Sequence, residues 1–172
     1  MIITTRRLRH APRGLSWLPM STETPPFPEA HLVVGFDGSP AATRALDAAA
    51  RLLSVRRPGR ITVAWVAHLP STVELSADAV AIVESDFDQV ARELRTTAAE
   101  RLADSGLSWD FQWRQGQIAH ELIAIAESAQ AARQEDVVVI MVGSSSSAMH
   151  RIVGSVAVSL ARHAPVPITV VP

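Results

Sequence analysis

From residue 31 onward the apolar positions follow two alternating periods, one typical of strands and one typical of helices. Short β-branched runs predict strands, and apolar residues that recur every three or four positions predict amphipathic helices between them. The predicted strands are Leu32–Phe36, Ile61–Ala67, Trp109–Trp113, Val137–Val142 and Val166–Val171. The helical stripes begin near Ala41, Val80, Ile118 and Val156. Strand and helix therefore alternate along the whole of this region.

This alternation predicts an α/β fold with a single domain: a five-stranded open parallel sheet with right-handed crossovers and helices on both faces. Trp109, Phe111 and Trp113 alternate with polar residues, which favours an edge strand. Val137–Val142 is apolar without interruption, which favours a central strand covered on both faces. A chain of 172 residues is long enough for one well-buried core.

The first thirty residues show no sustained periodicity, and we predict a flexible tail at 1–30 ahead of a domain at 31–172. The apolar stretch Leu15–Met20 is short and interrupted, so a signal peptide is disfavoured, whereas an organellar transit peptide and a chain start at Met20 remain open. No apolar run approaches the roughly 20 residues that span a bilayer. We expect a cytoplasmic protein without a membrane partner. The tail's basic residues are Arg6, Arg7, Arg9 and Arg13.

Composition removes several kinds of chemistry. The chain has no cysteine, and all 16 basic residues are arginine. Disulfides, thiol catalysis, Schiff-base lysines and the lysine of a Walker phosphate loop are therefore excluded. A net charge of -1 gives no broad field that would gather nucleic acid. The six histidines show no paired spacing, so we expect no zinc site.

Two turns are suited to ligand binding, because ligands of such sheets bind beyond the carboxyl ends of strands. The turn after the first strand contains Gly35, Asp37 and Ser39, and it is either a simple strand-to-helix turn or part of a site. The loop from Gly143 to Val156 is rich in small residues, and it is either a linker or a cradle for a polyphosphate.

Motifs at the two ends of the domain can be compared with known families. The first is Val33-Val34-Gly35-Phe36-Asp37-Gly38-Ser39, and the second group comprises Val139 to Gly143, Gly154-Ser155-Val156 and His163 to Val171. In combination they resemble the universal stress protein family. The resemblance covers about residues 31 to 172. It implies a Rossmann-like sheet similar to that of adenine nucleotide alpha-hydrolases and a homodimer through the C-terminal strand. It also implies binding of ATP, AMP or a cyclic adenine nucleotide, with Mg²⁺ present only with the nucleotide. The implied binding residues are Gly35, Asp37, Val66, Gly143, Ser144, Ser146, Gly154, Ser155 and Val156.

The late loop departs from the family's signature of glycine, two residues, glycine, nine residues, then Gly-Ser or Gly-Thr. Ser146 occupies the second glycine position, and seven residues separate it from Gly154. Serine disfavours the positive φ angles that glycine adopts freely, so phosphate binding is weakened. Arg151 lies inside the shortened loop and either pairs with a phosphate or is solvated.

The leading hypothesis is a nucleotide-binding module that acts in stress response through dimerisation and an unknown protein partner, with no enzymatic activity beyond slow ATP hydrolysis. The alternative is a dimeric interaction module that no longer needs a nucleotide. A hydrolase is disfavoured because the loop after Gly143 lacks the last glycine of a nucleophile elbow. Trp109, Phe111 and Trp113 form either a stacking platform for bases or, as we favour, a buried strand face. Trp65 is a candidate wall of the adenine pocket.

Overall fold

The computed structural model describes residues 28–54, 59–68, 77–133, 137–144 and 154–172; the other residues, including most of the predicted tail, Arg151 and Ser146, lie outside the described part. Along the chain the elements are β1 (Ala30–Gly35), α1 (Pro40–Ser54), β2 (Gly59–Ala67), α2 (Ala77–Leu102), β3 (Ser108–Gln115), α3 (Ile118–Ala132), β4 (Val137–Gly143), α4 (Ser155–His163) and β5 (Ile168–Val171).

The strands form one five-stranded sheet in the order β3-β2-β1-β4-β5, and every neighbouring pair is parallel. This confirms the predicted α/β sheet. The aromatic strand β3 lies at an edge as expected, β1 lies at the centre, and β4 lies between β1 and β5. The order reverses direction between β1 and β4, which makes that position the topological switch point of the sheet.

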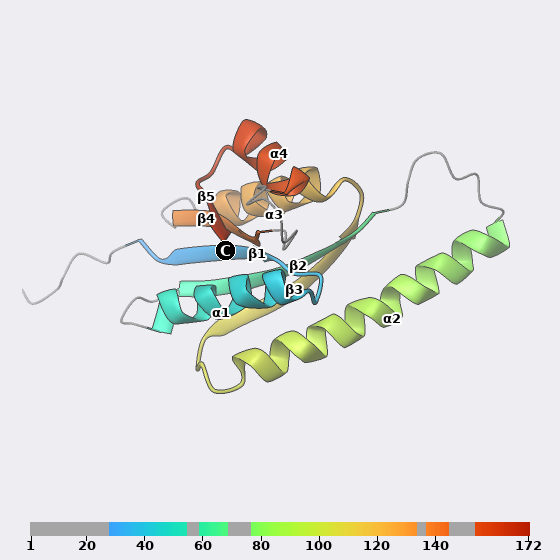
Figure 1. The fold of residues 1–172 in the computed structure, drawn as a ribbon, viewed down its shortest axis with the longest axis horizontal. Coiled ribbons are helices and arrows are strands. Elements are labelled where there is room, and N and C mark those ends of the chain that lie inside the picture. Colours follow the sequence, from blue (N-terminus) through green and yellow to red (C-terminus); the bar gives the residue numbers. More distant parts are fainter. Residues whose placement is uncertain (1–27, 55–58, 69–76, 134–136, 145–153) are drawn as a thin grey trace, which may run out of the picture.

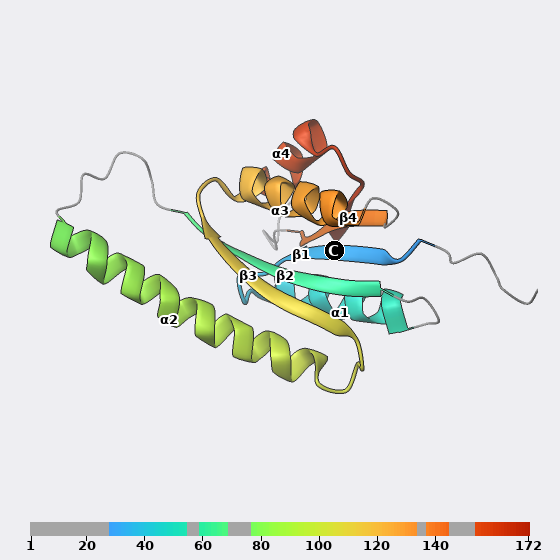
Figure 2. The same cartoon turned by 180° about the vertical axis from the view of Figure 1, so that it is seen from behind.

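Helices cover both faces of the sheet (Figures 1 and 2). The pleat of β1 shows how the core divides: Leu32 and Val34 belong to the cluster that includes α1 and the end of α2, while Val33 packs with α3 and α4. Trp109 and Phe111 pack against the first cluster, so they cover the core and form no open stacking platform.

β5 begins two residues later than predicted, at Ile168 instead of Val166. Pro167 has no backbone N–H and therefore cannot donate to the ladder, although its carbonyl oxygen accepts from the N–H of Ile140 at 3.0 Å. The regular pairing with β4 starts at Ile168.

α2 departs from the predicted burial. Its apolar stripe runs from Val80 to Leu102, and it is fully buried only toward the C-terminus. Ala98 and Leu102 are 0% and 3% exposed, whereas Val80 and Val90 are 40% and 37% exposed and Phe87 between them packs its ring against Trp65. The N-terminal half of the helix extends past the sheet in both views (Figures 1 and 2). Periodicity shows which side of a helix is apolar, but not how far its neighbours reach.

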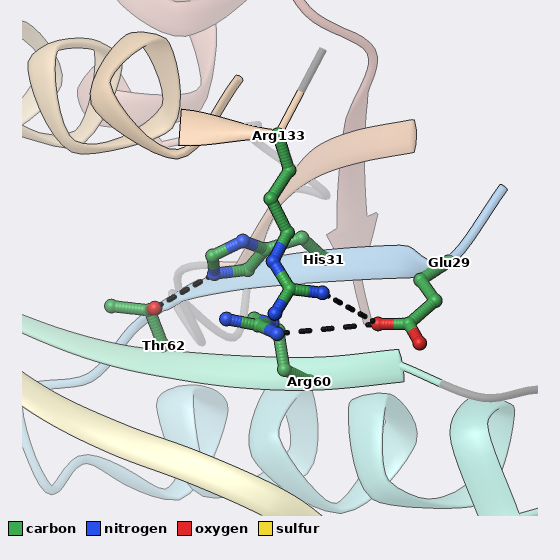
Figure 3. Close-up of polar contacts among 5 residues, drawn as sticks. All are labelled: Glu29, His31, Arg60, Thr62 and Arg133. Atoms are coloured by element: carbon green, nitrogen blue, oxygen red, sulfur yellow. Dashed lines mark hydrogen bonds and ion pairs between the residues drawn. The ribbon is translucent and has the colours of Figure 1, made fainter. Parts of the chain in front are cut away.

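Polar contacts tie the amino ends of the strands together (Figure 3). Glu29 Oε2 lies 3.2 Å from Arg133 Nη1 at the end of α3 and 4.0 Å from Arg60 Nη2 on β2. Buried His31 Nε2 donates to Thr62 Oγ1 at 2.8 Å, because the Thr62 hydroxyl itself donates to Asp110 Oδ1 at 2.7 Å. These contacts join β1, β2 and β3 at the end of the sheet opposite the predicted binding turns.

Candidate functional site

A cleft of about 500 Å³ opens at the carboxyl ends of β1, β2 and β4, at the topological switch point. The N-terminal turns of α1, α3 and α4 surround it. Eight of the nine predicted binding residues line this cleft, and the ninth, Ser146, lies outside the described residues. The eight are Gly35, Asp37, Val66, Gly143, Ser144, Gly154, Ser155 and Val156.

The turn after β1 has the geometry expected of a strand-to-helix connection. Asp37 Oδ1 accepts a hydrogen bond from the Ser39 N–H at 3.0 Å, and Ser39 Oγ accepts from the Ala42 N–H at 3.1 Å as the N-cap of α1. Gly38 has φ 78, which a residue with a side chain rarely adopts. The turn leaves Asp37 exposed at the cleft, and its Oδ2 accepts no hydrogen bond from the described residues.

Val66 presents its backbone to the cleft. The last contact between β1 and β2 is the hydrogen bond from Phe36 N–H to Ala64 O, at 2.8 Å. In a parallel ladder every second residue of a strand bonds to the same neighbouring strand. Val66 lies two residues beyond Ala64, so its N–H and C=O point to the β1 side of β2, where β1 has already ended. One donor and one acceptor are therefore available on this edge of β2.

The end of β4 has a structural role that the sequence pattern did not reveal. A Cβ atom at Gly143 would collide with the backbone carbonyl of Ala41, so the first turn of α1 packs directly on this glycine. The backbone N–H of Ser144 donates to Val171 O at 2.7 Å and is therefore engaged by β5. The hydroxyl of Ser144 remains for a ligand.

The N-terminus of α4 is open toward the cleft. Gly154 is the N-cap and has no side chain to accept a hydrogen bond, and the first helical bond runs from Val158 N–H to Gly154 O at 3.0 Å. The N–H groups of Ser155, Val156 and Ala157 have no hydrogen-bond acceptor within the described chain. Together with the helix dipole they favour a negatively charged or oxygen-rich group at this end of the cleft.

Electrostatically the cleft is nearly neutral. Among the described residues that line it, Asp37 is the single charged side chain. No group of three His, Asp or Glu within the described ranges is placed to hold a metal ion. Of the described helices, none combines the length and apolarity required to cross a membrane.

The floor of the cleft is apolar and comes from residues that the sequence did not single out. Leu122 and Val142 are buried, and Ile118 lies at the first position of α3. The signal for these residues was the Gly116-Gln117 turn between β3 and α3, which brings a further helix N-terminus to the carboxyl end of the sheet.

Trp65 lines the cleft as expected, and other aromatic rings support it. Its ring centroid lies 5.9 Å from those of Phe87 on α2 and Trp113 on β3. This aromatic cluster connects the cleft wall to the exposed half of α2.

A doubly wound parallel sheet with a cleft at its switch point defines the class of α/β domains that bind ligands beyond the ends of their strands. A model of the Universal stress protein family matches residues 30–172, and the chain belongs to that family. This confirms the resemblance seen in the sequence. No curated protein matches the chain.

Solved structures share the fold. A universal stress protein family member from Burkholderia pseudomallei is 24% identical, with a TM-score of 0.59 over 83% of this chain and 96% of the other. A universal stress protein in complex with cAMP is 21% identical, with a TM-score of 0.56 over 83% and 97%. A family protein from Arabidopsis thaliana with AMP bound is 14% identical, with a TM-score of 0.55 over 83% and 90%.

Proposed function

We propose that this protein is a nucleotide-responsive binding module that holds an adenine nucleotide in the cleft at the switch point. The observation that carries the proposal is the presence of three complementary features in one cleft: the free backbone edge at Val66, the carboxylate of Asp37 and the open N-terminus of α4. The AMP and cAMP found in two structures of the same fold support an adenine nucleotide as the ligand.

Each feature fits one part of the ligand. The N–H and C=O of Val66 match the acceptor and donor on the edge of adenine, and Leu122 and Val142 provide an apolar surface for the ring. Asp37 accepts hydrogen bonds from ribose hydroxyls. Gly154 and Ser155 bring the α4 N-terminus to the first phosphate.

The ligand preference follows from charge. Because the described cleft offers no basic side chain, additional phosphates gain little there, and we propose that ATP binds less than tenfold more tightly than adenosine. Mg²⁺ arrives only with the nucleotide. We propose no enzymatic role beyond slow ATP hydrolysis.

Mass spectrometry of small molecules released from gently purified protein tests the proposal. Adenosine or an adenine nucleotide bound at a substantial fraction of one per chain supports it. Protein that carries no adenine compound and takes up none at millimolar concentration contradicts it.

The second candidate function is an interaction module of the same fold that no longer uses a nucleotide. Two contacts at the end of β4 favour it: Ala41 packs on Gly143, and the Ser144 N–H bonds to β5. Both give these residues a structural role that requires no ligand. The ligand-release measurement separates the two functions, since only the first requires an adenine compound.

We further propose a homodimer through β5. The carbonyl oxygens of Pro167 and Val171 accept bonds from β4, so the alternate residues Ile168 and Val170 direct their backbone groups outward from the sheet edge. An unpaired edge of this kind favours pairing with a second copy.

Sedimentation at tens of micromolar, on the order of the concentrations at which weak dimers form, should show a dimer. Val170→Pro removes one outward N–H and should yield a folded monomer, whereas the exposed Arg162→Ala on α4 should leave the dimer intact. A monomeric wild type would refute the β5 interface.

A further inference from the structure

Residues 80–93 of α2 carry a partly exposed apolar stripe between two rows of charged residues. Val80, Val83, Phe87 and Val90 lie on one side of the helix at intervals of three and four residues. Val80 and Val90 are exposed, Val83 is half-buried, and the ring of Phe87 packs against Trp65 and Trp113. At 100° per residue, Glu84 and Asp88 flank this stripe on one side, where Arg92 and Arg95 continue the row toward the C-terminus, and Asp86 and Glu93 flank it on the other.

These carboxylates lack cationic partners. All four are exposed, and in the described part of the chain none of them takes part in an ion pair; Glu93 Oε1 accepts only the amide of Gln89 at 3.1 Å. An apolar stripe between unpaired acids is complementary to a segment that combines basic and large apolar residues.

The chain itself contains such a segment in residues 6–18, and we propose that this segment docks in cis along residues 80–93 of α2, over the exposed Val80 and Val90. Residues 1–20 contain four arginines and no acidic residue. The apolar residues Leu15, Trp17 and Leu18 follow directly. Two effects stabilise the docked segment: its arginines pair with the acidic side chains beside the stripe, and its apolar side chains are buried against the stripe.

The connection is long enough. β1 starts and α2 ends at the same end of the sheet, because α2 leads directly into the parallel strand β3. Residues 19–27 span up to about 30 Å when extended. The direct distance has three roughly perpendicular components: about 18 Å along the helix from Leu102 back to Val90, about 10 Å for two strand spacings, and about 10 Å between the sheet and the helix layer. Together they give roughly 23 Å.

Reversal of the tail's charge in the full chain tests the proposal. Amide hydrogen exchange is measured over residues 80–93 in the wild type and in Arg6→Glu/Arg7→Glu/Arg9→Glu/Arg13→Glu. With an effective concentration of about 1 mM and a local Kd on the order of 0.1 mM, a docked segment slows local opening about tenfold. The reversed tail should therefore exchange about tenfold faster there, with no change in β1 or β4.

A second set of variants distinguishes specific docking from a general charge effect. When the four acids beside the stripe are also reversed, the charges of tail and helix are complementary again, and slow exchange should be restored. This variant adds Glu84→Arg, Asp86→Arg, Asp88→Arg and Glu93→Arg to the reversed tail. The matched control Glu100→Arg/Asp104→Arg, at exposed acids beyond the stripe, should leave the wild-type exchange unchanged. The proposal is overturned if both tails give equal exchange or if the restoring variant fails to slow it. It is also overturned if protection rises with protein concentration, because the protection then comes from a second copy.

Discussion

Gly143→Ala should destabilise the fold by about 3 kcal/mol, near the upper end of what overpacking costs. The added Cβ would occupy the space of the Ala41 carbonyl group, which belongs to backbone and cannot rotate away as a flexible side chain does. α1 would have to move off β4, and the buried contacts between them would loosen. Urea unfolding should show a lower midpoint with an unchanged slope.

Gly106→Ala is the matched control for this substitution. Gly106 has φ 64 and nothing within 4 Å of an added Cβ, so the cost there is the left-handed backbone alone, about 1 kcal/mol. If Gly143→Ala is no more destabilising than Gly106→Ala, then the packing of α1 on Gly143 is not the reason for glycine at that position.

Asp37→Ala should weaken adenosine binding by about tenfold to a hundredfold, because a hydrogen bond to a charged group contributes roughly 1.5–3 kcal/mol. Asp37 is the single charged side chain among the described residues of the cleft, so no neighbour replaces its contact with the ribose. Titration calorimetry of wild type and variant with adenosine measures the effect.

Asp37 also accepts the Ser39 N–H, so part of any loss comes from the turn itself. Asp37→Asn keeps an acceptor for that bond and separates the two roles: its stability should match the wild type, while its affinity should lie between those of wild type and Asp37→Ala. Asp104→Ala, at an exposed position remote from the cleft, should bind as the wild type does. Unchanged affinity in Asp37→Ala would remove Asp37 from the site.

Much of the fold could be predicted from local patterns because each pattern has a local cause. The helical stripe that begins near Ala41 predicted α1, and the start of the helix has a local cause, since Ser39 caps it and Pro40 is its first residue. The alternation at Trp109 to Trp113 predicted the edge strand because an edge needs only one apolar face.

The features that were missed depend on distant parts of the chain. Gly143 was predicted to bind phosphate, but its contact with Ala41 arises from how α1 crosses β4, which no local pattern encodes. Ile118 and Leu122 line the cleft because the β3–α3 connection returns to the same end of the sheet. The exposure of Val80 and Val90 depends on where the sheet ends beneath α2.

The central claim is that the cleft binds an adenine compound, and calorimetric titration of the wild-type protein with adenosine, AMP and ATP tests it most directly. The account predicts saturable binding of all three ligands, with ATP within about tenfold of adenosine. Absence of a binding isotherm for every one of them at millimolar concentration would contradict the claim.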